Sequence, residues 1–127
     1  MRKIIMLVLL LAATPARAHD YGQWENADPV VKQWYKSLMQ PDNPRTSCCG
    51  SSDAYWCDDI HIRDSKTFCK ITDDRPDEPL MRRHIDIGTE IEIPVYKINK
   101  DPNLAGHSVI FLSPAGFVYC FVPANGS

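Results

Sequence analysis

The chain has 127 residues, with 14 Lys and Arg against 16 Asp and Glu, and 44% of its residues are hydrophobic. This length is enough for one domain with one modest core, and a second domain is implausible. Beyond the N-terminus the only basic doublet is Arg82-Arg83. Proteins that bind nucleic acid or anionic lipid concentrate positive charge, so nucleic acid is excluded as a partner.

Residues 1–18 have the three parts of a cleavable signal peptide. Arg2 and Lys3 give a positive start, residues 4–13 are an unbroken apolar run, and Ala16-Arg17-Ala18 offers small residues to signal peptidase. The apolar run is roughly half of the ~20 residues that a spanning helix needs. Cleavage before His19 removes three basic residues and leaves 11 basic against 16 acidic ones, a net charge of −5. We therefore expect an exported protein of the periplasm or extracellular space, without a membrane span after cleavage.

The first element after the cut is predicted to be a helix. Asp28 can cap the first free amides and Pro29 fits the first helical position. Apolar residues then recur at helical spacing as far as Met39, and Gln40-Pro41 predicts the end of the helix. Residues 41–53 are rich in turn-forming residues and are predicted to be a loop.

From Ala54 onward the pattern is typical of short strands. Alternation predicts one strand here. One of its faces carries Trp56, Ile60 and Ile62, and the other, which is expected to face water, carries Tyr55, Cys57, Asp59 and His61. A turn at 63–66 and a returning strand at 67–72 follow. Residues 73–88 are predicted to be a long charged loop. Residues 90–95 are predicted to be an alternating strand, and Pro94 places it on the edge of the sheet. Residues 108–112 and 117–122 are predicted to form a last hairpin.

These elements predict an α+β fold in residues 19–127. One N-terminal amphipathic helix packs on a small antiparallel sheet of about five strands, because the chain shows no alternation of strands with helices. A partly open barrel is the arrangement that would bury the apolar rows best.

Five cysteines follow the predicted cut: Cys48, Cys49, Cys57, Cys69 and Cys120. In an oxidising compartment most of them are expected in disulfides, and an odd number leaves one thiol free or paired between chains. Adjacent cysteines rarely bond to each other, so Cys120 is a natural partner for Cys48 or Cys49. Cys57 and Cys69 meet only if the hairpin between them departs from an even-length turn, so their pairing stays open.

Two kinds of metal site are considered. After cleavage His19 would offer its amine and imidazole to copper, with His61, His84 or His107 as a second ligand. Calcium could bind the acidic cluster of Asp73, Asp74, Asp77 and Glu78, although Arg75, Arg82 and Arg83 lie close enough in sequence to neutralise it.

Several segments together are similar to a known group of proteins. They are Trp34–Pro41, Ser47-Cys48-Cys49-Gly50 with Asp53-Ala54-Tyr55-Trp56, Ile71–Pro76, and the ending Tyr119–Pro123. The set resembles a family of small secreted bacterial proteins with no known activity, in which alanine often stands at the position of Cys57. The resemblance implies a bacterial, exported origin and assigns no catalytic or binding residue.

No catalytic motif for a nucleophile, a zinc protease or a phosphate loop is found in the sequence. The leading hypothesis is a non-catalytic binding or structural module that presents a surface to a protein, glycan or small ligand, with Tyr55, Phe68 and Tyr96 as candidate aromatics of that surface. The alternatives are a copper-handling protein that uses His19 and a thiol-dependent enzyme.

Overall fold

The structure is a computed structural model that describes residues 28–124. The predicted signal peptide and His19 lie outside the described residues. The described helices are α1 (Pro29–Ser37), the one-turn α2 (Asp77–Leu80) and the 3-10 helix η1 (Val95–Lys97). The described strands are β1 (Met39–Gln40), β2 (Asn43–Ser47), β3 (Asp53–Trp56), β4 (Asp59–Arg63), β5 (Lys66–Lys70), β6 (Glu90–Ile93), β7 (Val109–Leu112) and β8 (Val118–Val122).

The strands of this part of the chain form three small antiparallel sheets, β1-β2, β3-β7-β8 and β4-β5-β6. The fold is therefore α+β and rich in strands, with more of them than the sequence predicts. No sheet closes into a barrel, so the barrel alternative is wrong. Among residues 28–124 no helix is long and apolar enough to cross a membrane.

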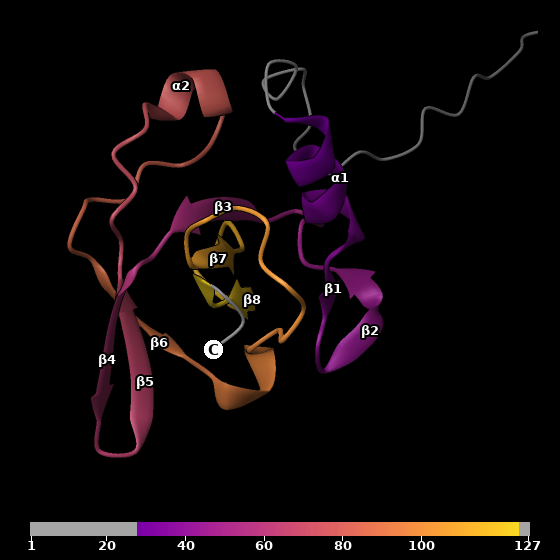
Figure 1. The fold of residues 1–127 in the computed structure, drawn as a ribbon. Coiled ribbons are helices and arrows are strands. Elements are labelled where there is room, and N and C mark those ends of the chain that lie inside the picture. The colour runs from indigo at the N-terminus through magenta and orange to yellow at the C-terminus, as the bar shows by residue number, and fades with distance from the viewer. Residues whose placement is uncertain (1–27, 125–127) are drawn as a thin grey trace, which may run out of the picture.

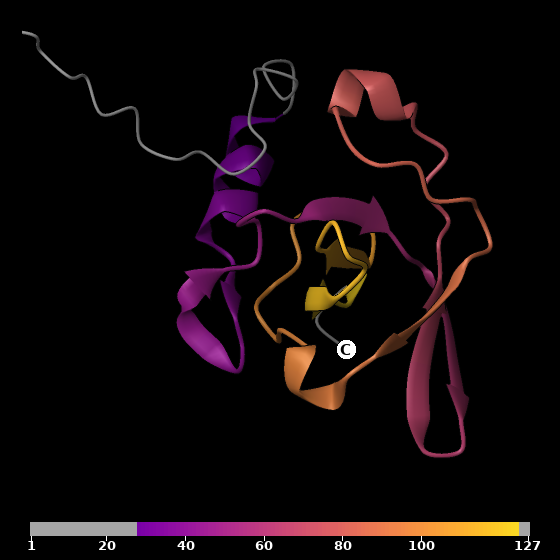
Figure 2. The ribbon, with the colours of Figure 1, turned by 180° about the vertical axis from the view of Figure 1, so that it is seen from behind.

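The sheet β3-β7-β8 lies in the middle of the molecule and is covered on both faces (Figures 1 and 2). All four residues of β7 are buried. Val109 and Phe111 pack in the cluster that contains Trp34 and Leu38, whereas Ile110 and Leu112 pack in the cluster of the sheet β4-β5-β6. This double burial explains why β7 is apolar throughout instead of alternating.

Helix α1 begins as predicted and ends two residues early. Oδ1 of Asp28 accepts a hydrogen bond from the amide of Val30 at 2.8 Å, and Pro29 follows. Leu38 is extended rather than helical, and its side chain is only 1% exposed. Burial of Leu38 and entry into β1 therefore end the helix before Met39.

The prediction of a loop over residues 41–53 is wrong for its first half. β2 pairs with β1 and includes Pro44. Since β1 is the only strand that pairs with β2 among the described residues, Pro44 sits on an edge strand, where its missing N–H is tolerated.

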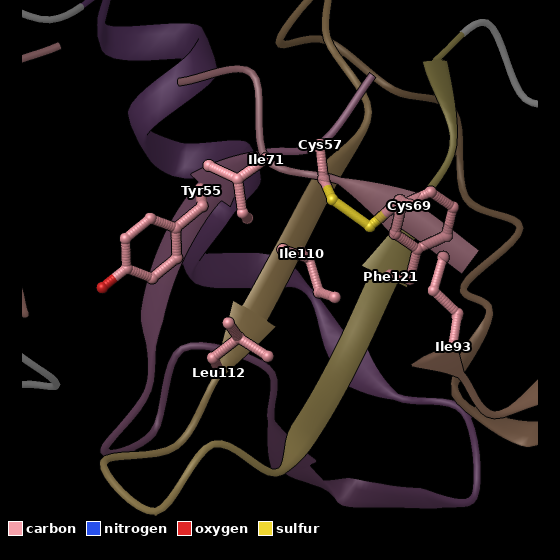
Figure 3. Close-up of a cluster of buried hydrophobic side chains, with 8 residues drawn as sticks. All are labelled: Tyr55, Cys57, Cys69, Ile71, Ile93, Ile110, Leu112 and Phe121. Atoms are coloured by element: carbon pink, nitrogen blue, oxygen red, sulfur yellow. A yellow bond between two sulfur atoms is a disulfide. The ribbon is translucent and has the colours of Figure 1, made fainter. Parts of the chain in front are cut away.

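The single strand predicted from Ala54 to Ile62 is two strands in different sheets. β3 pairs with β7 and β4 pairs with β5, and the chain crosses between the sheets at Cys57-Asp58. Tyr55 and Cys57, predicted on the wet face, are 1% and 0% exposed and face the core (Figure 3). The crossing breaks the phase of the alternation, which is why one period cannot describe the whole stretch.

The sheet β4-β5-β6 follows the prediction more closely. Asp64 and Ser65 make the predicted turn with φ of 51° and 62°. β6 lies on an edge, as expected, but it ends at Ile93, before Pro94, two residues earlier than predicted. Val95, predicted to be the last residue of this strand, instead lies in η1 and is 81% exposed.

Candidate functional site

The structure joins four of the five cysteines in two disulfides. Cys48 bonds to Cys120 and Cys57 bonds to Cys69. The expected partnership of Cys120 with one of the adjacent pair is confirmed. Cys57 lies outside the β4–β5 ladder, in the crossing to β4, so it reaches Cys69 despite a two-residue turn, and Figure 3 shows the bond inside the core.

Cys49 is the free cysteine, and its surroundings make it a poor nucleophile. Its thiol donates a hydrogen bond to the carbonyl oxygen of Tyr35, with the sulfur at 3.2 Å. Burial raises the pKa of the Cys49 thiol to about 11, although Lys36 acts in the opposite direction. Almost no thiolate therefore exists near neutral pH.

The acidic cluster predicted as a calcium alternative is divided by arginines. Asp73 is buried, and its carboxylate accepts hydrogen bonds from Nη2 of Arg75 and Nη1 of Arg82, both at 2.6 Å. Asp77 binds Nε of Arg82 at 2.9 Å. The pKa of Asp73 lies well below its usual range, because hydrogen bonds from Arg75 and Arg82 outweigh the burial that would raise it.

The rest of that cluster lies at the surface. Asp74 and Glu78 are exposed, and Arg83, expected to help neutralise the cluster, donates its backbone amide to Asp53 at 3.4 Å. No group of three or more His, Cys, Asp or Glu in residues 28–124 is arranged to hold a metal ion. The calcium hypothesis therefore has no support from Asp73, whose charge is already compensated.

Trp56 stands at the centre of a row of stacked side chains. The guanidinium of Arg75 lies 3.9 Å from its ring centroid, and the imidazole of His107 stacks on it at 3.8 Å with an angle of 11° between planes. Nδ1 of His107 lies 2.8 Å from Oδ2 of Asp58, whose other oxygen accepts the amide of Ser108. These contacts tie three loops to the end of β3, which is a structural role.

The other described histidines are also engaged by carboxylates. His84 lies between Asp77 and Asp86, with each ring nitrogen 2.6 Å from one of them. Nε2 of His61 is 2.9 Å from Asp59, close in distance but not aligned as a hydrogen bond. Whether any of them joins His19 in a copper site remains a prediction, since His19 lies outside the described residues.

An open hollow with a volume of about 290 Å³ lies between α1 and the loop that precedes β7. It is lined by Trp34, Ser37, Asp101, Pro102 and Leu104. Trp34 is 8% exposed, and its indole nitrogen is buried without a hydrogen-bond partner. The indole nitrogen is therefore closed off from the hollow, and other atoms of Trp34 line it.

The hollow was not predicted from the sequence. The sequence places Trp34 among the apolar residues that predict the helix, and it predicts nothing specific for residues 101–104. Their approach depends on how α1 packs on β7, where the ring of Tyr35 lies 5.9 Å from that of Phe111. The residues of either segment alone therefore do not predict the hollow.

Of the three aromatics predicted to form a binding face, only one is exposed. Tyr55 is buried and its hydroxyl donates to the carbonyl of Arg83, so its prediction as a surface residue is wrong. Phe68 is half-buried under the guanidinium of Arg63, at 4.3 Å. Tyr96 is 60% exposed, the one of the three that fits the expectation.

Compared with known proteins, the chain matches no family model, no curated protein and no solved structure. The function must therefore be argued from the geometry alone.

Proposed function

We propose that this protein is an exported, non-catalytic binding module of the periplasm or extracellular space, and that its binding site is the hollow beside Trp34. The observation that carries the proposal is the open hollow, which joins an aromatic ring, a carboxylate and apolar side chains at one place on the surface. The two disulfides support the compartment, because such bonds persist mainly where the surroundings are oxidising.

The lining defines the chemistry of the ligand. The carboxylate of Asp101 prefers a hydrogen-bond donor, and Trp34, Pro102 and Leu104 offer apolar contact. About 290 Å³ is at the lower end of ligand pockets, which fits one sugar ring. An amino sugar with an acetamide group supplies both features, through its hydroxyl and amide donors and through its methyl group and ring face.

The thiol-enzyme alternative receives less support than binding. The one free thiol among the described residues, that of Cys49, is held protonated by burial and bonded to a backbone carbonyl. The buried charged side chains of Asp73 and Arg82 are bonded to each other.

Titration with chitobiose, the disaccharide of N-acetylglucosamine, tests the proposal by NMR of the indole N–H groups. We expect the signal of Trp34 to shift with saturation, while that of Trp56, which is stacked between other side chains, stays in place. Asp101→Asn should weaken the binding at least about tenfold, since the carboxylate loses its charge. Asp74→Asn is the matched control, because Asp74 is exposed outside the hollow. If millimolar chitobiose leaves the indole signal of Trp34 in place, or shifts those of Trp34 and Trp56 alike, the amino-sugar assignment of this hollow is refuted.

A further inference from the structure

The strand β4 forms an outer edge of the molecule. It pairs with β5 on one side, and no described strand pairs with its other side. In Figures 1 and 2 the β4–β5 hairpin extends away from the central sheet, and β4 lies on its outer side in both views. An unprotected edge of this kind is a template for another strand.

The turn between the strands decides which backbone groups of β4 are free. Asp64 and Ser65, both at positive φ, form a two-residue turn of the type I′ class, which closes on the hydrogen-bonded pair Arg63–Lys66. Hydrogen-bonded and non-hydrogen-bonded pairs alternate along an antiparallel ladder. The N–H and C=O of Ile60 and Ile62 therefore point away from β5, toward the open edge.

The side chains of the same two residues are also uncovered. Ile60 pairs with Cys69 and Ile62 with Thr67, so both lie on the face that carries the buried Cys69. The hairpin projects beyond the core, and this leaves Ile60 40% and Ile62 76% exposed. Two β-branched side chains and their backbone groups thus stand unpaired on one edge.

We propose that β4 pairs in the antiparallel direction with β4 of a second copy of this chain, about a two-fold axis at His61. The sequence Asp59-Ile60-His61-Ile62-Arg63 is complementary to itself in that register. Asp59 faces Arg63 of the second copy, Ile60 faces its Ile62, and the two His61 face each other across the axis.

The backbone pattern agrees with this register. Because His61 turns its own N–H and C=O toward β5, the central pair of the new ladder is a non-hydrogen-bonded one. The pairs on either side, Ile60 with Ile62 of the second copy, are then hydrogen-bonded pairs, which use the groups that are free. A parallel pairing would instead set Asp59 beside Asp59 and Arg63 beside Arg63, so charge selects the antiparallel one.

The pairing is expected to be weak. Five residues per copy bury much less than the roughly 1,600 Å² of a standard interface. In the single chain the guanidinium of Arg63 already binds Glu90. That ion pair is exposed and contributes little free energy. Exchanging Glu90 for Asp59 of the second copy therefore changes the free energy very little. A dissociation constant of hundreds of micromolar is a reasonable expectation, which makes the dimer relevant at high local concentration.

Sedimentation equilibrium of the exported chain with its disulfides formed, from about 20 μM to 1 mM, tests the proposal. Asp59→Arg alone and Arg63→Asp alone each place like charges opposite each other and should weaken self-association at least about tenfold. An equal mixture of the two variants should associate as strongly as the natural chain, because every facing pair is then of opposite charge. Recovery on mixing cannot come from a variant that fails to fold.

Amide hydrogen exchange supplies an independent readout. The amides of Ile60 and Ile62 should gain protection as concentration rises, whereas that of His61, which bonds to β5, should be protected at every concentration. The proposal is overturned if the natural chain stays monomeric at 1 mM. It is overturned equally if the charge variants associate like the natural chain, or if their mixture does not recover association.

Discussion

The buried carboxylate of Asp73 is expected to be a principal ionic support of the fold, and Asp73→Asn tests it. The Asp73 side chain is fully buried, and its partner Arg82 is only 4% exposed. Oδ2 also accepts the backbone amide of Trp56 at 3.1 Å. The substitution removes the negative charge while the guanidinium of Arg82 remains buried.

The magnitude follows from the burial of this pair. Removing one partner of a buried ion pair costs about 3–5 kcal/mol, since the remaining charge stays desolvated. Asn keeps one acceptor oxygen, so we expect the lower end, about 3 kcal/mol of unfolding free energy. Small domains have roughly 5–15 kcal/mol in total, which makes this a large fraction.

Urea unfolding with the disulfides intact measures the effect, and Asp74→Asn, on the exposed neighbouring residue, is the matched control with an expected change within about 0.5 kcal/mol. Acid unfolding gives a second readout. The folded pKa of Asp73 is depressed, so its contribution is complete above about pH 4 and is lost as the pH falls through the folded value. Asp73→Asn should therefore flatten the loss of stability in acid. Equal stabilities of the two variants would refute the reasoning.

The other predictions concern the disulfides, the free thiol and His84. Replacing both Cys48 and Cys120 by Ala should lower the free energy of unfolding by about 4 kcal/mol, and replacing both Cys57 and Cys69 by about 3 kcal/mol. The difference arises because the two disulfides close loops of different length, with sequence separations of 72 and 12. Urea unfolding of the two variants measures which loss is larger. At pH 8 iodoacetamide should react with Cys49 far more slowly than it reacts with the thiol of free glutathione, because a pKa of about 11 leaves roughly one Cys49 thiol in a thousand as thiolate. If Cys49 reacts as fast as glutathione, its burial is contradicted. Hydrogen bonds to Asp77 and then Asp86 raise the pKa of His84, so the stability it contributes is complete below its unfolded pKa of about 6.5 and is lost as the pH rises through the folded value. His84→Ala should remove that slope from the pH profile of stability, and an unchanged slope would show that the contact has no energetic weight.

Local signals predicted the elements whose causes are local. The cap of α1 depends on Asp28 and Pro29 alone, and the turn at Asp64-Ser65 and the edge position of β6 follow from residue type. The extent of an element is a different matter. α1 ends before Met39 because the side chain of Leu38 is buried in the core. The core residues around it come from strands far along the chain, so the sequence of the helix does not predict this end.

The pairing of cysteines was predictable in one case and open in the other for a physical reason. Cys48 and Cys49 cannot readily bond to each other, and that leaves Cys120 as a partner. Cys57 was placed on a continuous strand, where its face is opposite to that of Cys69. The crossing between sheets releases Cys57 from that ladder, and periodicity carries no sign of a crossing.

Periodicity also says which face of a strand is apolar without saying whether anything covers it. Ile60 and Ile62 do share a face with the buried Cys69, as alternation implies. They are nevertheless exposed, because the hairpin extends beyond the core. Trp34 presents the opposite case, since its side chain is buried while its indole N–H has no partner. The buried carboxylate of Asp73, in contrast, is fully engaged by Arg75 and Arg82 in holding the loop after β5. The hollow beside α1 and the edge of β4 lie on different elements, so binding at one leaves the residues of the other untouched, and Asp101→Asn should not change self-association.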